Sequence, residues 1–487
     1  MTKTYITNVI KKSDIGKWIP GQRVLITAPT GSGKSQLVKN VIYEHAKEMG
    51  WRVLLLSNRR LLKNQNIEDL TGKEDVVIAK NYQQLEKRIE EGDSFQELFY
   101  GYDMVVFDEC HYFFSDAAFN RNTDMLMPAL TWKPDDKILL FMTATPEIVL
   151  KHTKDFSPVY QLPKDYSYLE NIYYFNQEET IENILYDLPP EDKAIIFMGS
   201  AEKAFRLHEK FNNSSFVCST DNAKFKDKSN IETSNGIAET GRFEERFLFT
   251  TKVLDNGVNI VDAQVRHIII DMMNMVDFIQ CLGRKRIVEG EKINLYFRNY
   301  NRGNVSYSLT RINDSLASIN DFLNMEKEEF AQAYKRKEFD EAIHNDITLN
   351  QARLTFLLWN KEELEGMMVH LNGFLEDVSL RLTDEPFPEW QKESGRIKCA
   401  ELYFEKKSLS ETMELFVGRK LFKEEREIFK SVFFEKVVSV RKETSRQGKH
   451  SILNILEENN MDGYEIYSHK ETSGDRRNET YWTIKRK

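Results

Sequence analysis

Cysteine is scarce in this sequence. The 487 residues include 4 cysteines, and no two of them form a CxxC pair. The spacing therefore predicts neither a disulfide framework nor a cysteine zinc site, and it fits a reducing compartment. The four positions are Cys110, Cys218, Cys281 and Cys399.

Long apolar runs and an excess of basic residues are also absent. No stretch of about 18 apolar residues occurs, and charges interrupt the N-terminal segment where a secretory core would be apolar. We therefore expect a cytoplasmic protein. The formal net charge of -9 argues against coating of nucleic acid by bulk charge, although it allows a local basic groove.

The hydrophobic residues are numerous enough to form several cores. Hydrophobic residues make up 41% of the chain, and its length predicts about three domains at roughly 150 residues each. Short, continuous apolar runs alternate with helical stretches between residues 24 and 144, which is typical of buried parallel strands. This pattern predicts a doubly wound α/β domain over residues 1–150.

The alternation of apolar runs and helical stretches also divides the rest of the chain into domains. A second series of apolar runs predicts another α/β domain over residues 169–300, joined by a linker at 151–168 that contains Pro158 and Pro163. Residues 301–446 are predicted to be a helical accessory domain. Residues 447–487 are predicted to be a helix and a hairpin, either winged-helix-like or a capping subdomain that needs no DNA.

A phosphate-binding loop follows the first apolar run. Its glycines would let backbone N–H groups close around an anion, and the helix after it adds partial positive charge. Lys34 would reach the β and γ phosphates of ATP, and Ser35 would hold Mg²⁺. The loop reads Ala28-Pro29-Thr30-Gly31-Ser32-Gly33-Lys34-Ser35.

A second apolar run ends in adjacent carboxylates. Asp108 and Glu109 would lie at the carboxyl edge of the sheet, where ligands bind in open α/β folds. We expect Asp108 to coordinate Mg²⁺ and Glu109 to orient and deprotonate the attacking water. His111 is placed to sense the nucleotide.

Five further stretches carry a family resemblance. They are Ser57-Asn58-Arg59-Arg60-Leu61 through Gln65, Asn81-Tyr82-Gln83, Thr143-Ala144-Thr145-Pro146, Thr250 through Asn259, and Gln280-Cys281-Leu282-Gly283-Arg284-Lys285-Arg286. In this order the chain resembles a superfamily 2 helicase of the DEAD/DEAH-box type, with a DECH version of motif II. The spelling QxxGRxR of the last stretch is similar to that of viral, phage and mobile-element helicases.

The resemblance implies two tandem RecA-like domains with ATP and Mg²⁺ at their interface. It assigns nucleotide contacts to Asp255, Gly257 and Gln280, and arginine fingers to Arg284 and Arg286. It also assigns to Thr143 and Thr145 the coupling between the nucleotide site and the nucleic-acid site. The implied contacts with nucleic acid are Arg59, Arg60, Gln83, Thr250 and Thr251.

These observations predict an ATP-dependent helicase or translocase that acts on single-stranded or partly duplex DNA, with RNA as the less favoured track. Two alternatives stay open. One is an ATPase switch in a phage-defence or restriction complex, gated by nucleic acid and without unwinding. The other is an origin-binding initiator helicase whose residues 301–487 confer site specificity. Protein partners in such a complex are possible, and no membrane is expected.

Overall fold

A computed structural model describes residues 5–58, 70, 72–118, 120–220, 222–252, 259–344, 348–383, 387, 396–437 and 448–487. The chain divides into two compact units. The first comprises residues 1–171 and 189–387, and the second comprises residues 172–188 and 388–487. Within the described residues, no helix is both long and apolar enough to cross a bilayer.

The first sheet has six strands in the order β3-β2-β4-β5-β1-β6, and its paired strands all run parallel. Every residue of the four central strands is buried, as continuous apolar runs predict. The strands are β1 (Arg23–Thr27), β2 (Val53–Ser57), β3 (Val77–Asn81), β4 (Met104–Asp108), β5 (Ile138–Thr143) and β6 (Val159–Gln161).

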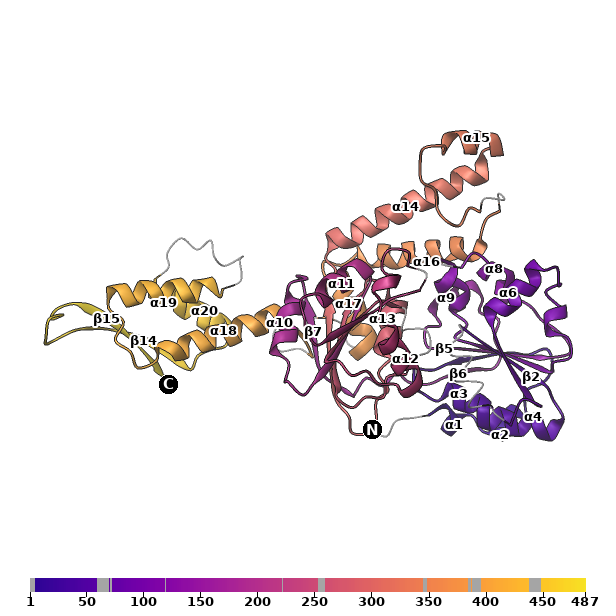
Figure 1. Cartoon of the computed structure of the whole chain (residues 1–487), viewed down its shortest axis with the longest axis horizontal. Coiled ribbons are helices and arrows are strands. Elements are labelled where there is room, and N and C mark those ends of the chain that lie inside the picture. The colour runs from indigo at the N-terminus through magenta and orange to yellow at the C-terminus, as the bar shows by residue number, and fades with distance from the viewer. Residues whose placement is uncertain are drawn as a thin grey trace. The chain divides into compact units, whose positions relative to one another are not determined.

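Helices cover both faces of this sheet. Alternate residues of a strand point to opposite faces, so Val105 and Phe107 join one hydrophobic cluster while Met104 and Val106 join another. Figure 1 shows α6, α8 and α9 over one face and α1 to α4 over the other. The helices are α1 (Ile6–Val9), α2 (Lys12–Ile15), α3 (Lys34–Gln36), α4 (Tyr43–Met49), α6 (Tyr82–Glu90), α7 (Tyr112–Ser115), α8 (Thr123–Leu126) and α9 (Glu147–His152).

The segment 151–168 is more than the bare linker that the sequence predicts. Its residues 159–161 form β6, which pairs with β1 at the edge of the first sheet. Two prolines signal an interruption but not a strand, and three residues are too few to show an apolar pattern. The first α/β domain therefore extends beyond residue 150.

The second sheet has seven strands in the order β13-β7-β12-β11-β8-β10-β9. The predicted second series of strands is thus present, with one addition, β13, from far along the chain. The strands are β7 (Leu169–Phe175), β8 (Lys193–Met198), β9 (Ser214–Val217), β10 (Phe247–Thr250), β11 (Val265–Asp271), β12 (Ile293–Arg298) and β13 (Ile397–Cys399). Its helices are α10 (Thr180–Asp187), α11 (Ala201–His208), α12 (Ile231–Thr240) and α13 (Met275–Leu282).

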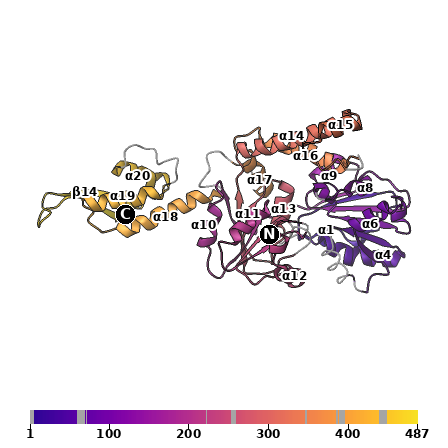
Figure 2. The ribbon, with the colours of Figure 1, turned by 45° about the horizontal axis from the view of Figure 1, so that its top comes forward.

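Four helices follow the second sheet within the first unit. They are α14 (Arg302–Asn324), α15 (Lys327–Ala333), α16 (Gln351–Met367) and α17 (Gly373–Thr383). Helices α14 and α16 run side by side in both views (Figures 1 and 2). Helix α16 also packs against α7, α8 and α9 of the first α/β domain. The helical region predicted for 301–446 is therefore divided, because its first part belongs to this unit.

In the second unit, the described residues after β13 form three helices and a hairpin around a core of their own. Helices α18 (Ala400–Phe416), α19 (Lys423–Glu435) and α20 (Lys449–Glu458) precede the antiparallel strands β14 (Tyr464–Lys470) and β15 (Thr480–Arg486). Buried residues from all five elements form one hydrophobic cluster. The predicted helix and hairpin are present, and residues 417–421 add bridges to β15.

Candidate nucleotide site

Strand order brings the predicted motifs of the first domain together. Strand β5 lies between β4 and β1, and the registers pair Asp108 with Met142 and Thr27 with Thr143. The loops that leave these three strands therefore meet at one carboxyl edge of the sheet. This is the edge at which ligands bind in open α/β folds.

The phosphate loop is held by its own backbone and hydroxyl groups. Gly33 has a φ of 87°, in the left-handed region that favours glycine, directly before α3. The Ser32 hydroxyl donates to the Pro29 carbonyl at 2.6 Å. The Lys34 ammonium, 7% exposed, donates to the Ala28 carbonyl at 3.0 Å. Its charge is thus fixed inside the loop predicted to hold phosphates, and Ser35 follows half-buried.

Glu109 pairs with this lysine across the edge. Its Oε1 lies 3.3 Å from Lys34 Nζ. Burial opposes its ionisation, but the nearby positive charges, that of Lys34 foremost, together outweigh this and hold the pKa of Glu109 below its ordinary value. The residue also has a φ of 50°. A non-glycine residue in that region costs about 1–3 kcal/mol, a strain that tends to persist at functional sites.

Asp108 has the opposite electrostatic environment. It is buried, and its Oδ1 accepts from the Glu109 backbone N–H at 3.1 Å. Burial, and then the neighbouring charge of Glu109, raise the pKa of Asp108. A divalent cation at this point would favour the ionised carboxylate.

His111 links the carboxylate motif to the end of β5. Its Nδ1 lies 3.0 Å from Thr143 Oγ1 and 3.5 Å from Glu109 Oε2. The Thr145 backbone N–H also donates to Thr143 Oγ1, at 3.0 Å. The Thr143 hydroxyl can then donate to an unprotonated Nδ1, and burial, which lowers the pKa of His111, favours that neutral ring. The structure thus brings the three predicted coupling residues together.

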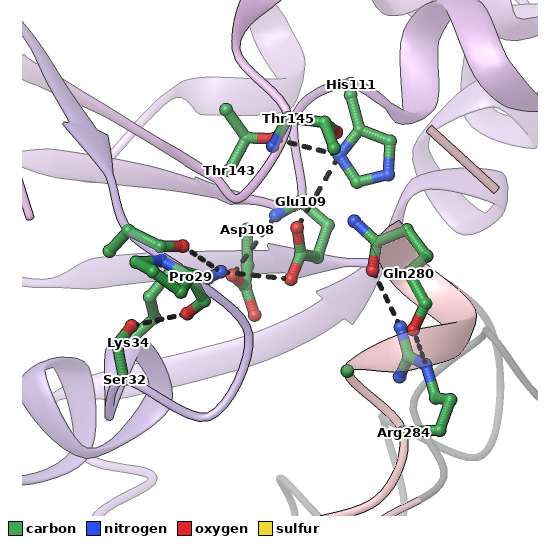
Figure 3. A network of polar contacts seen from close by, with 12 residues as sticks. Pro29, Ser32, Lys34, Asp108, Glu109, His111, Thr143, Thr145, Gln280 and Arg284 are labelled. Atoms are coloured by element: carbon green, nitrogen blue, oxygen red, sulfur yellow. Dashed lines mark hydrogen bonds and ion pairs between the residues drawn. The ribbon is translucent and has the colours of Figure 1, made fainter. Parts of the chain in front are cut away.

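Gln280 and Arg284 of the second α/β domain lie beside this network (Figure 3). Arg284 is 5% exposed, and its guanidinium donates to the Gln280 side-chain oxygen at 2.9 Å and to the Gln280 carbonyl at 3.2 Å. Its positive charge also lowers the pKa of Glu109. The arginine is therefore oriented by the glutamine and lies within electrostatic reach of the carboxylate.

The other two basic residues of this stretch have separate surroundings. Arg286 donates to Asn259 Oδ1 at 2.6 Å, and burial, then the charge of Arg284, lower the pKa of Arg286 to about 10. Lys285 is buried and pairs with Glu291 at 2.5 Å. Lys285 therefore has a structural partner, whereas both arginines remain candidates for contact with a nucleotide.

Gly283 marks a close approach between the two domains. A Cβ at this position would fall 1.8 Å from Thr30 Oγ1 of the phosphate loop. Its φ of -75° is ordinary for any residue, so the glycine is required for space rather than for conformation. The C-terminal end of α13 thus lies directly against the phosphate loop.

The residues predicted to contact nucleic acid have different surroundings in the structure. Gln83 lies in the first turn of α6, where its amide donates to Asn58 at 3.3 Å. Thr250 is fully buried and donates to the Thr251 carbonyl at 3.1 Å, so its hydroxyl does not face a groove. This corrects the expectation for Thr250, since a residue at the end of a central strand can be covered on all sides. Thr251 is half-buried. Four predicted residues, Arg59, Arg60, Asp255 and Gly257, lie outside the described residues.

Sequence reasoning missed the aromatic support behind the carboxylates. The Tyr82 hydroxyl donates to the Asp108 carbonyl at 2.8 Å, and its ring stacks on Tyr112 with centroids 4.5 Å apart. The Tyr112 hydroxyl donates in turn to the buried Glu86 at 2.9 Å. Tyr82 lies in the stretch Asn81-Tyr82-Gln83, of which the family resemblance implies a role for Gln83 alone. Glu86 carries no signal beyond being a charge on the apolar side of a helix.

The donor set fits a nucleoside triphosphate and a hard divalent cation. Ser35 and Asp108 supply the oxygen ligands that Mg²⁺ prefers, and Lys34 supplies a cation for phosphate. Two buried polar atoms, Glu109 Oε2 and Gln280 Nε2, have no hydrogen-bond partner among the described residues. An acceptor and a donor are therefore available in the site for water and phosphate.

Comparison with known proteins identifies the first domain. The family model for the DEAD/DEAH box helicase matches residues 8–153. These residues are thus a DEAD/DEAH box helicase domain, which confirms the resemblance to superfamily 2 helicases in the first α/β domain. A search of curated proteins found no match to the chain.

A solved structure has a distant likeness to the chain. It contains a variant of S. cerevisiae Dbp5 bound to a variant of Gle1 and IP6. The sequences are 12% identical, the match covers 65% of this chain and 83% of that chain, and the TM-score is 0.41. This likeness is too weak to bear on function.

Proposed function

We propose that the protein is an ATP-dependent nucleic-acid helicase or translocase that hydrolyses ATP to ADP and phosphate. The observation that carries the proposal is the convergence of Lys34 and Glu109 on one sheet edge with Arg284 from the other domain. Neither domain alone supplies both the phosphate loop and the arginine. Hydrolysis then depends on the approach of the two domains, which is what a motor requires.

Each side chain has a distinct task in the proposed reaction. The backbone N–H groups of residues 28–35 and Lys34 hold the phosphates. Glu109, kept ionised by Lys34, accepts a proton from the attacking water. Arg284, held by Gln280, stabilises the charge that develops on the γ-phosphoryl oxygens. Magnesium held by Ser35 and Asp108 would neutralise phosphate charge.

His111 can link the nucleotide site to the bound nucleic acid. Its hydrogen bond to Thr143 joins the residue after the carboxylates to the loop that precedes α9. His111 lies 3.5 Å from Glu109. If Glu109 moves on hydrolysis, this contact changes, and the hydrogen bond between His111 and Thr143 would change with it. We propose that this link transmits the state of the nucleotide to the nucleic-acid face.

DNA is the favoured track because of the spelling Gln280-x-x-Gly283-Arg284-x-Arg286, which is similar to that of replication and mobile-element helicases. Strand contacts of such motors go mainly to phosphates, so little sequence specificity is expected from the two α/β domains. Gln83 and Thr251 are the described residues that we propose as contacts.

The test is steady-state ATP hydrolysis with single-stranded DNA, duplex DNA and RNA, each at low and moderate salt. Strong stimulation by one polymer that persists at moderate salt supports the motor and identifies its track. No stimulation by any polymer contradicts the proposal and favours an ATP switch controlled by a partner protein. Stimulated hydrolysis without strand separation in a fluorescent unwinding assay favours the switch gated by nucleic acid.

A second candidate is a site-specific initiator helicase. The observation that favours it is a third strand-like segment beside the C-terminal hairpin, where Leu421 exchanges backbone hydrogen bonds of 2.8 and 2.9 Å with Trp482 of β15. The order helix, extended segment, two helices and hairpin is that of a winged helix, a fold that often binds duplex DNA.

The test of this candidate compares the full chain with a variant truncated at residue 447. A nuclease footprint at one duplex sequence that the truncation abolishes, with stimulated hydrolysis retained, supports the initiator. Residues 448–487 hold seven basic and seven acidic side chains, so any such binding must come from placed contacts rather than bulk charge. Absence of a preferred sequence contradicts this candidate.

A further inference from the structure

Helices α16 and α17 contact both α/β domains. Phe356 and Trp359 of α16 belong to the same buried cluster as Phe113 and Phe114, which directly follow the carboxylate motif. Phe374 of α17 contacts the ring of Tyr300, next to the end of β12, with centroids 5.1 Å apart. The helical pair thus joins the domain that carries Glu109 to the domain that carries Arg284.

Ion pairs hold the same two helices to α9. Arg381 of α17 lies 3.5 Å from Glu147 at the start of α9 and 3.1 Å from Glu363 of α16. Lys151 of α9 also pairs with Glu362 of α16. Because α9 begins just after the loop of Thr145, helix α16 is fixed to the part of the first domain that carries the coupling residues.

A hydrogen bond connects α16 to the N-cap of α13, the helix that precedes Arg284. The Asn274 amide donates to Asn360 Oδ1 at 3.0 Å. The orientation of Asn274 is determined by its other bonds, because its Oδ1 accepts from the backbone N–H groups of Val276 and Asp277 at 2.9 and 3.1 Å. The amide nitrogen must therefore face Asn360, and Asn360 must accept.

Helix α13 transmits this contact to the site. Asn274 is the N-cap of α13, an eight-residue helix that is followed at once by Gly283 and Arg284. Such a helix is about 12 Å long, and its backbone hydrogen bonds join each turn to the next. Val276 also lies in the buried cluster shared with α16. A shift at the capped end is thus carried to the arginine.

We infer that Asn360 is a positioning residue that sets the approach of Arg284 to the nucleotide. The inference rests on the proposed function and adds to it a part of the helical region, which the family resemblance does not cover. Asn360 does not touch the reacting atoms. It acts by anchoring the cap of α13 to a helix that is itself fixed on the first domain.

The experiment compares two substitutions at one position. Asn360→Leu keeps the branched arrangement of four side-chain heavy atoms but removes the acceptor, and we expect kcat of stimulated ATP hydrolysis to fall about three- to tenfold with KM for ATP unchanged. Asn360→Asp keeps an acceptor for the Asn274 amide and should retain the wild-type kcat. Asn320→Leu is the matched control, because among the described residues the Asn320 amide oxygen bonds to Asn324 of the same helix, at 3.0 Å.

A second background tests the route of the effect. In the Arg284→Ala variant, Asn360→Leu should cause no further loss of kcat, since the residue that it positions is gone. Wild-type kcat in Asn360→Leu, an equal loss in both backgrounds, or a changed KM would each overturn the inference. A wild-type chain without stimulated hydrolysis would instead refute the proposed function, and the inference would fall with it.

Discussion

The two sides of the candidate site are built in different ways. On the first sheet, Asp108 and Thr143 end adjacent parallel strands, so the backbone ladder fixes their positions, and Lys34 begins α3 after the phosphate loop that leaves β1. On the second domain, Arg284 and Arg286 follow a helix, and side-chain bonds to Gln280 and Asn259 orient them.

This difference separates binding from activation. Groups fixed by a buried sheet are preorganised and can hold phosphates at any stage of a cycle. Groups oriented by side chains on another domain reach the nucleotide only when the domains are close. Loss of a group on the first side should therefore affect binding or basal chemistry, while loss on the second should affect turnover alone.

Arg284→Ala gives the largest expected effect. If Arg284 contacts the transferring phosphoryl group, its loss should lower kcat by about 10³-fold or more while ATP binding persists. Arg286→Ala removes the same charge two residues away. It should lower kcat less than Arg284→Ala does. Rapid-quench kinetics and binding of a fluorescent ATP analogue measure both quantities. Equal, mild losses in the two variants would refute the assignment of either residue as the finger.

Glu109→Gln examines the opposite side. Removal of the base should lower kcat by about 10²- to 10⁴-fold and leave a complex that holds both ATP and nucleic acid. Lys34→Ala is the partner experiment, because loss of the cation should abolish tight ATP binding itself. Hydrolysis at the wild-type rate by Glu109→Gln would show that another group activates the water.

The strands and loops that form the first side can be predicted from the sequence because the information is local. The loop at 28–35 and the carboxylates at 108–109 each follow an apolar run, so the strand and its functional end occupy one short stretch. The sequence also predicts both series of strands. It does not predict β13, since three residues near position 397 pair with a strand more than 200 residues earlier. No local pattern reports such a pairing.

The second side is harder to predict for the same reason. The stretch at 280–286 can be found by its spelling, but its partners cannot. Asn259 lies 27 residues before Arg286, and Asn360 lies 86 residues after Asn274. The approach of Gly283 to Thr30 joins different domains. These contacts follow from packing between elements rather than from periodicity.

Gly283→Ala tests how closely the two sides meet. A Cβ 1.8 Å from Thr30 Oγ1 forces α13 away from the phosphate loop, and a displacement of about 1 Å can cost about 10²-fold in rate. We expect that loss in kcat with ATP binding retained. Gly366→Ala on α16 is the control, because a Cβ there meets no atom within 4 Å. Equal kcat in the two variants would contradict the close approach.

Glu86→Gln should leave turnover nearly unchanged and alter stability instead. Burial raises the pKa of Glu86 from 4.5 to about 7, against hydrogen bonds from Asn120 and Tyr112 that lower it. Between these values the folded chain binds more protons than the unfolded chain, so the free energy of unfolding falls as pH rises from about 4.5 to about 7. The part due to Glu86 is about 3 kcal/mol. Glutamine cannot ionise, so denaturant unfolding at pH 5 and pH 8 should show a smaller decrease in the variant than in the wild type. Equal decreases in the free energy of unfolding would mean that Glu86 stays ionised in the folded chain. The Tyr112 hydroxyl would then donate to a carboxylate rather than to a neutral carboxyl group.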